Sequence, residues 1–196
     1  MANWIEIENK LSDILNHDYY RQKFGINLPR HYARQCVQRA QGSALPAYSG
    51  EISVIELKHA ARPGCPTRLV RGLDSRRSNS PFGEWWIDYA LFERYRQATS
   101  AMPPTLREQK IRAFMRARSA VSEDWSNMAG IAELDLPVGS RTPALVGKAH
   151  YQRLVTDPKN PDYVPNVFLM GGDLQFYVCV RNHCWIRPAS ALTGAA

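Results

Sequence analysis

The sequence predicts an α+β fold in which an N-terminal helical unit precedes a sheet domain. Apolar residues recur at helical spacing early in the chain, and short runs with strand character gather late, with further helical segments between them. We find no internal repeat. We therefore expect a helical unit over residues 1–45 and a sheet domain over residues 50–196.

Two helices are expected first. An apolar stripe at helical spacing predicts a helix over residues 3–17. Pro29 is well placed to begin a second helix and Gly42 to end it. The linker over residues 42–50 is rich in small residues and proline. The stripe of the first helix consists of Trp4, Ile7, Leu11, Ile14 and Leu15, and the inner face of the second of Tyr32, Cys36, Val37 and Ala40.

Short strands and two more helices follow the linker. Asp88 is a candidate N-cap for a helix through Gln97. Thr105 and Glu108 form a capping-box pattern that opens a helix to Ser119. Residues 151–166 hold three prolines and indicate a loop. The expected strands are 52–57, 67–70, 131–136, 143–149, 168–170, 174–180 and 184–186.

Composition limits the function classes. No apolar run approaches the ~20 residues of a membrane helix, and the chain does not begin with a signal-peptide pattern. We expect a cytoplasmic protein, or one delivered into a target cell by a route that needs no signal peptide. The sparse cysteines indicate reduced thiols. Cys179, His183 and Cys184 match no common zinc pattern, so we expect no metal.

The net charge of +7 and the pI near 9.4 leave three kinds of partner open: nucleic acid, an anionic ligand or an acidic protein. Lys110, Arg112 and Arg116 in the helix ending at Ser119 favour a non-enzymatic nucleic-acid-binding protein. Against it, the sequence contains no helix-turn-helix, zinc-finger or RNP pattern.

One candidate phosphate-binding motif ends the strand over residues 67–70. If the strand extends from Thr67 to Arg71, Leu69 and Arg71 point one way, and Arg68 and Val70 the other. Arg71 precedes Gly72 at the strand end, where its planar fork could clamp a phosphate, and Arg68 is the second candidate. The alternative is that both are ordinary surface arginines.

A second motif contains Phe82, Gly83, Trp85 and Trp86. Two adjacent tryptophans on one strand cannot both enter one core. One could stack on a flat ring such as nicotinamide or adenine. The alternative is that they cover opposite faces of a sheet.

The third motif precedes the strand over residues 174–180. Gly171 and Gly172 allow the backbone to approach a ligand closely. Gln175 offers an uncharged donor and acceptor among apolar residues, and Asp173 is a candidate carboxylate. The alternative is a loop-to-strand junction whose Gln175 points to solvent.

Taken in order, these motifs resemble the ADP-ribosyltransferase-like fold over roughly residues 65–180. The chain is most similar to bacterial NAD glycohydrolase toxins of the tuberculosis necrotizing toxin group. The resemblance implies a split, mixed or antiparallel sheet that binds NAD or NADP as substrate. It also implies a toxin or effector, for which an acidic immunity protein is a possible partner.

The resemblance also implies roles for individual residues. Arg71 would hold the NAD phosphates, an aromatic residue (Phe82, Trp85 or Trp86) would pack beside the nicotinamide, and Gln175 would reach its ribose. The family's middle motif commonly has Ser or Thr after the aromatic residue, where this chain has Ile87. Many transferases carry Glu at the place of Gln175, so the neutral amide favours hydrolysis over mono-ADP-ribosyl transfer.

Overall fold

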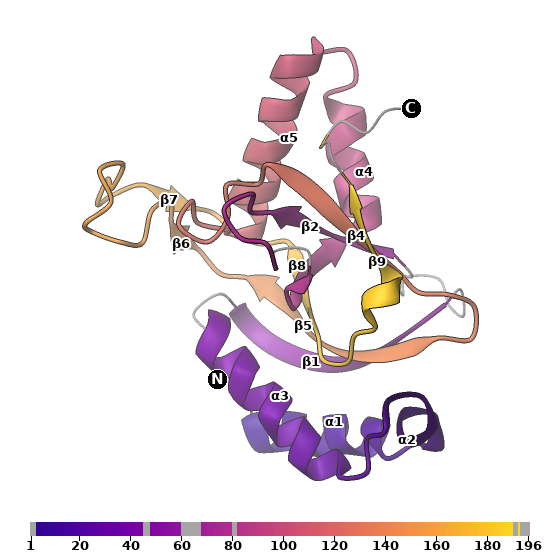
Figure 1. Cartoon of the computed structure of the whole chain (residues 1–196). Helices are drawn as coiled ribbons and strands as arrows, with labels where there is room; N and C mark the ends of the chain where they lie inside the picture. The colour runs from indigo at the N-terminus through magenta and orange to yellow at the C-terminus, as the bar shows by residue number, and fades with distance from the viewer. Residues whose placement is uncertain (1–2, 45–47, 60–67, 80–81, 190–191, 193–196) are drawn as a thin grey trace.

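Three helices open the chain, and a sheet with two further helices follows (Figure 1). The computed structural model describes residues 3–44, 48–59, 68–79, 82–189 and 192. The predicted α+β fold is confirmed. Among the helices of these residues, none is long and apolar enough to cross a membrane.

The N-terminal helices are α1 (Trp4–Leu15), α2 (Asp18–Phe24) and α3 (Pro29–Ala44). The Asn3 side chain caps α1 by accepting a hydrogen bond from the Glu6 amide. The ring of His17 accepts one from the Tyr19 amide and caps α2, while the helix predicted over residues 3–17 is α1, which ends at Leu15.

Within the described residues, seven strands form one antiparallel sheet. Helices α4 (Tyr89–Ala98) and α5 (Pro104–Ser119) lie between β3 and β4 in the chain. A hairpin of β6 (Gln152–Arg153) and β7 (Phe168–Leu169) extends from the body (Figure 1). The sheet order is β1 (Tyr48–Lys58), β5 (Arg141–Ala149), β8 (Leu174–Val178), β3 (Trp85–Asp88), β2 (Arg68–Leu73), β4 (Gly130–Asp135) and β9 (Ile186–Ala189).

The ladder between the two central strands is short. β2 and β3 pair only at Leu69 with Asp88 and at Val70 with Ile87. Beyond these pairs β2 continues along β4 to Leu73, while β3 stays paired with β8. The sheet is therefore split where Arg71 and Trp86 would otherwise face each other.

One face of the sheet, which we call the inner face, curves around its own side chains. All seven strands contribute to the buried cluster on it, and the only partly buried helical residue packed there is Phe24. Among the described residues, Trp185 is the other contributor from outside the strands and the turn after β4, so strand side chains make up most of this cluster. The buried strand residues of this cluster are Leu57, Leu69, Trp86, Ala132, Leu134, Ala144, Phe176, Val178 and Ile186.

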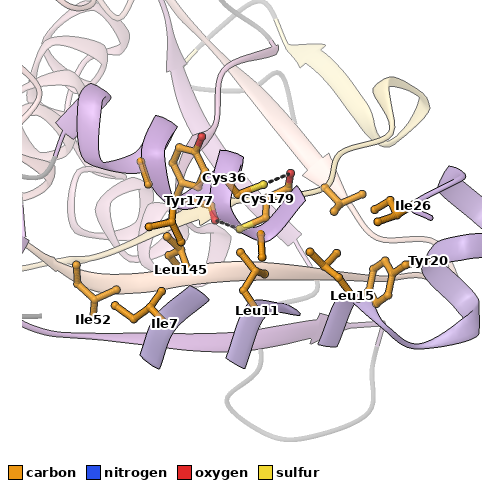
Figure 2. Packing of buried hydrophobic residues seen from close by; sticks show 14 residues of the cluster. Ile7, Leu11, Leu15, Tyr20, Ile26, Cys36, Ile52, Leu145, Tyr177 and Cys179 are labelled. Atoms are coloured by element: carbon orange, nitrogen blue, oxygen red, sulfur yellow. Dashed lines mark hydrogen bonds between the residues drawn. The ribbon is translucent and has the colours of Figure 1, made fainter. Parts of the chain in front are cut away.

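Helices cover both halves of the opposite, outer face. Helices α1 and α3 pack against β1, β5 and β8 through Leu11, Cys36, Leu145 and Tyr177, and the N-terminal unit thereby shares a core with the sheet (Figure 2). Helices α4 and α5 pack against β2, β3 and β4, with Met115 of α5 in the buried cluster. The residues predicted for the apolar stripe of α1 and for the sheet-facing side of α3 do pack in this cluster. Trp4, Ile14 and Tyr32 are partly buried there.

Some predicted element boundaries differ in the structure and one is confirmed. Gly42 lies inside α3, and β1 begins earlier than predicted, at Tyr48. Residues 45–47 of the linker, Cys65 and Thr67 lie outside the described residues. Asp88 caps α4 as predicted, since its side chain accepts from the Ala90 amide.

Two further predictions were wrong. The N-cap of α5 is Pro103, which makes no side-chain cap, and Pro104 begins the helix with the backbone angle that proline already has, so the capping box does not form. The strand predicted over residues 184–186 is mostly a 3-10 helix, η3 (His183–Trp185). The Asn182 side chain accepts from the Cys184 amide and stabilises that turn in place of a strand.

Candidate functional site

A cavity of about 130 Å³ lies at the split between β2 and β3. It touches residues of both faces of the sheet, because Arg71 and Trp86 belong to the inner face and Val70, Ile87 and Gln175 to the outer face. The end of α5 and the segment after it close the cavity. Its lining consists of Val70, Arg71, Gly72, Trp85, Trp86, Ile87, Met115, Ser119, Ala120, Val121, Trp125, Ser126, Met128 and Gln175.

Three tryptophans are among the residues that line this cavity. Trp86 is buried on the inner face, and its Nε1 donates to the Gly83 carbonyl at 3.0 Å. Trp85 is half-buried on the outer face, edge-on to Tyr177, so the two tryptophans cover opposite faces of the sheet. Trp125 is more exposed, at 37%, beside the loop that follows α5. Apolar walls of this kind accept a flat ring.

Two buried polar side chains of the lining lie together. Gln175 is buried, and its Nε2 donates to the Ser119 carbonyl at 2.6 Å, which ties β8 to the end of α5. The Oγ of Ser119 is buried and has no hydrogen-bond partner among the described residues. Buried hydroxyls are nearly always paired, so a lone one in a cavity wall is a feature that a ligand could satisfy.

Arg71 carries a buried guanidinium with unused donors. Within the described part of the chain, its Nε and Nη1 have no hydrogen-bond partner. A Cβ at Gly83 would lie 1.3 Å from Nη1, so the guanidinium lies against the Gly83 backbone and would have to move if another residue stood there. Burial lowers the pKa of Arg71 to about 10, an effect that Glu84 opposes and Arg181 reinforces.

Two other predicted residues lie away from the cavity. Arg68 is on the outer face, as predicted, where it forms an ion pair with Glu133 and its guanidinium lies 3.8 Å from the Tyr89 ring centroid. Phe82 stacks on His183, with ring centroids 4.6 Å apart. Neither residue contributes to the cavity lining.

Asp173 and the glycine pair connect β8 to other elements. Asp173 is buried, accepts from the Tyr95 hydroxyl and pairs with Arg118 at 3.0 Å. Gly171 has a φ of 68°, and a Cβ on it would lie 2.4 Å from the Ala149 carbonyl oxygen. The close approach made by Gly171 is therefore to the chain's own backbone, and Gly172 also adopts a positive φ of 100°.

Two arginines of α5, Arg112 and Arg116, are held by contacts within the protein. Arg116 is buried and donates to the carbonyls of Val121 and Ser126. Arg112 pairs with Glu108 at 2.8 Å. Because Arg116 faces the protein interior, this helix does not present the basic stripe that the nucleic-acid-binding alternative requires.

Sequence reasoning missed Ser119 and Trp125. Both lie in or just after the predicted helix, in a stretch without a recognisable motif. Their role depends on β8 and β2, which meet the end of α5 only in the folded chain. The sequence signal that could have drawn attention to Trp125 is a tryptophan within a short polar segment.

Comparisons with known proteins add little to this description. No protein-family model and no curated protein matches the sequence. Among solved structures, one similar chain is described as Rhs1-CT in complex with cognate immunity protein RhsI1. It is 17% identical, with a TM-score of 0.37, and the match covers 72% of this chain and 80% of that chain. At this TM-score the likeness supports no statement on function.

Proposed function

We propose that this chain is an NAD-consuming enzyme that hydrolyses the nicotinamide–ribose bond at the cavity between β2 and β3. One observation carries the proposal. The three sequence motifs, which end near Gly72, Ile87 and Gln175, lie on the neighbouring strands β2, β3 and β8 and contribute to one cavity. Residues about a hundred positions apart are thereby gathered around a single aromatic-walled space.

The lining suggests a division of roles. The indole rings of Trp85, Trp86 and Trp125 would enclose the nicotinamide ring. The lone Ser119 hydroxyl and the Gln175 amide would form hydrogen bonds to its carboxamide or ribose. The Ser119 hydroxyl would supply the group that the middle motif lacks at Ile87. Arg71, at the split, would bind the phosphates.

The reaction needs little covalent chemistry from the protein. The bond between the ribose C1′ and the nicotinamide nitrogen breaks, and its electron pair leaves with nicotinamide. Water then adds to the oxocarbenium-like carbon and loses a proton, giving ADP-ribose. Binding of the remote phosphates can support distortion of the ribose in this step.

Two features favour water over a macromolecular acceptor. Gln175 is neutral, and Asp173, the other candidate just before β8, has its carboxylate bound by Tyr95 and Arg118. No carboxylate is among the cavity-lining residues that the structure describes. Mono-ADP-ribosyl transfer to a protein or nucleic acid is the alternative.

An enzyme that consumes NAD would act as a toxin or effector, and its charge of +7 would suit an acidic inhibitor protein.

Release of free nicotinamide from NAD, and in parallel from NADP, tests the proposal. Arg71→Ala should weaken NAD binding by about 2–4 kcal/mol, because a charged hydrogen-bonding partner is lost. Arg68→Ala is the matched control, since it removes the same side chain from the other face of the same strand and should leave turnover unchanged. Label from NAD should appear in ADP-ribose only. No nicotinamide release by the folded protein would refute the proposal, and heavy labelling of protein or nucleic acid would make the chain a transferase.

A further inference from the structure

A second arginine shares the unusual state of Arg71. Arg181, which follows β8, has a buried Nη1 without a hydrogen-bond partner among the described residues. Its side chain is only 18% exposed, and its Nη2 donates to Glu84 at 3.1 Å. Among the described residues, Arg71 and Arg181 are the arginines whose terminal Nη1 is buried without a hydrogen-bond partner, and each unpaired buried donor costs free energy.

The segment before β3 brings these two guanidinium groups together. Arg71 Nη1 lies against Gly83, and the next residue, Glu84, holds Arg181. The segment is fixed there, since the Glu84 carbonyl accepts from the Val178 amide at 2.9 Å. The charges sense each other, because the field of Arg181 lowers the pKa of Arg71 and that of Glu84 raises it.

The charges of this cluster do not balance. Two guanidinium groups face one carboxylate, and the Glu84 side chain is 36% exposed, so it is free to swing outward. Carboxylates and phosphates both match the planar fork of arginine, so Glu84 occupies the kind of position that a phosphate oxygen would take. A ligand with two linked phosphates could use the donors of both arginines at once.

We propose that Arg71 and Arg181 form a clamp for a diphosphate group and that Glu84 occupies it as an internal anion until the ligand displaces it. The inference rests on the proposed function only in naming the diphosphate of NAD as the natural occupant. Arg71 also lines the cavity at the split, so a ligand held by the clamp would lie next to the aromatic walls. Arg181 thus becomes a binding residue that no sequence motif indicated.

Titration calorimetry with inorganic pyrophosphate at low salt tests the clamp without any turnover. The folded protein should bind one equivalent. Arg71→Gln and Arg181→Gln should each weaken binding by about 10- to 100-fold, the loss expected when a charged hydrogen bond is removed. Glu84→Gln should strengthen binding several-fold, because the internal competitor is gone. Arg181→Lys keeps the charge without the fork and should give an intermediate affinity.

Arg187→Gln is the matched control, because it removes one positive charge from a side chain that is 74% exposed on β9. It should leave pyrophosphate affinity unchanged. The clamp is wrong if the wild type does not bind pyrophosphate, if Arg181→Gln and Arg181→Lys bind as tightly as the wild type, or if Arg187→Gln loses as much affinity as Arg181→Gln.

The clamp and the proposed enzyme can fail separately. Pyrophosphate binding that depends on both arginines, together with no nicotinamide release from NAD, would retain the clamp and reject the enzyme. Nicotinamide release that is unchanged in Arg181→Gln, with no pyrophosphate binding by the wild type, would reject the clamp and retain the enzyme.

Discussion

Helices cover both halves of the outer sheet face, but the two coverings differ in how completely they pack. Under α1 and α3, apolar residues such as Leu11 and Leu145 fill the space between helices and strands with no exposure to solvent. Under α5, the split between β2 and β3 leaves a cavity bordered by Met115 and the unpaired Ser119 hydroxyl. The comparison suggests that the packing under α1 and α3 contributes stability. The half under α5 is less stable than full packing would make it, because it forms a site.

The largest effect should come from truncating core residues in the two halves. Leu11→Ala removes a fully buried side chain from close packing and should lower the free energy of unfolding toward the upper end of about 2–5 kcal/mol. Met115→Ala should lie nearer the lower end, because Met115 already borders a void and makes fewer contacts. Urea unfolding of both variants measures the difference. Equal losses, or a larger loss for Met115→Ala, would contradict the comparison.

A charge placed in the cavity wall should have the next largest effect. Gln175→Glu puts a buried carboxylate beside the Ser119 carbonyl, so the pKa of the new group should be raised in the folded state. The free-energy cost of burying the charged carboxylate is then complete above the raised pKa, and it is relieved as the pH falls through that pKa. We expect a loss of about 2–3 kcal/mol at pH 7 that shrinks toward pH 4.

Gln175→Met is the matched control for that pH dependence, because it keeps the length of the side chain and carries no titratable group. Its loss of stability should not change between pH 7 and pH 4. A loss in Gln175→Glu that is equally constant with pH would show that the residue reaches solvent.

The smallest expected effect is a difference in the free energy of unfolding between variants of the two arginines of β2. Arg71→Met removes a cation that burial disfavours and should raise the free energy of unfolding by about 1–3 kcal/mol in the absence of ligand. Arg68→Met removes a partly exposed ion pair and should lower it by at most about 1 kcal/mol. Chemical unfolding of both variants at pH 7 provides the measurement.

The pH dependence gives a check on the origin of the Arg71 effect. Burial lowers the pKa of Arg71 from its ordinary value to about 10 in the folded protein. The free-energy cost of holding Arg71 charged in the folded protein is therefore complete below pH 10 and is relieved as the pH rises above 10. The gain in Arg71→Met should be constant from pH 6 to 9. A variant that is less stable than the wild type would instead show that Arg71 supports the fold.

Local patterns predicted much of the fold. The apolar stripe of α1, the N-cap Asp88 and the alternation of Arg68 and Arg71 across β2 depend on residues within a few positions of each other, and all three are found in the structure. The predictions were wrong at the N-cap of α5, which is Pro103, and at the turn that Asn182 stabilises. Both depended on competition between local interactions.

The site could be predicted only in part, because it depends on sheet order. The sequence marked Arg71, Trp85, Trp86 and Gln175 as candidates, but not that β2, β3 and β8 are neighbours. It could not reveal Ser119, Trp125 or Arg181, whose importance comes from burial next to distant strands. Strand pairing over such separations is decided by packing of the whole chain and not by any one segment.

Fluorine NMR of protein labelled with fluorotryptophan tests the central claim most directly, namely that a nicotinamide ring occupies the cavity at the split. Three of the five tryptophans, Trp85, Trp86 and Trp125, line this cavity, while Trp4 and Trp185 do not. Single Trp→Phe variants assign the five signals. Addition of NAD should shift the three cavity signals and leave the other two in place, and ADP-ribose, which lacks the ring, should shift the three much less. Unmoved cavity signals at saturating NAD, or equal shifts with ADP-ribose, would contradict the account.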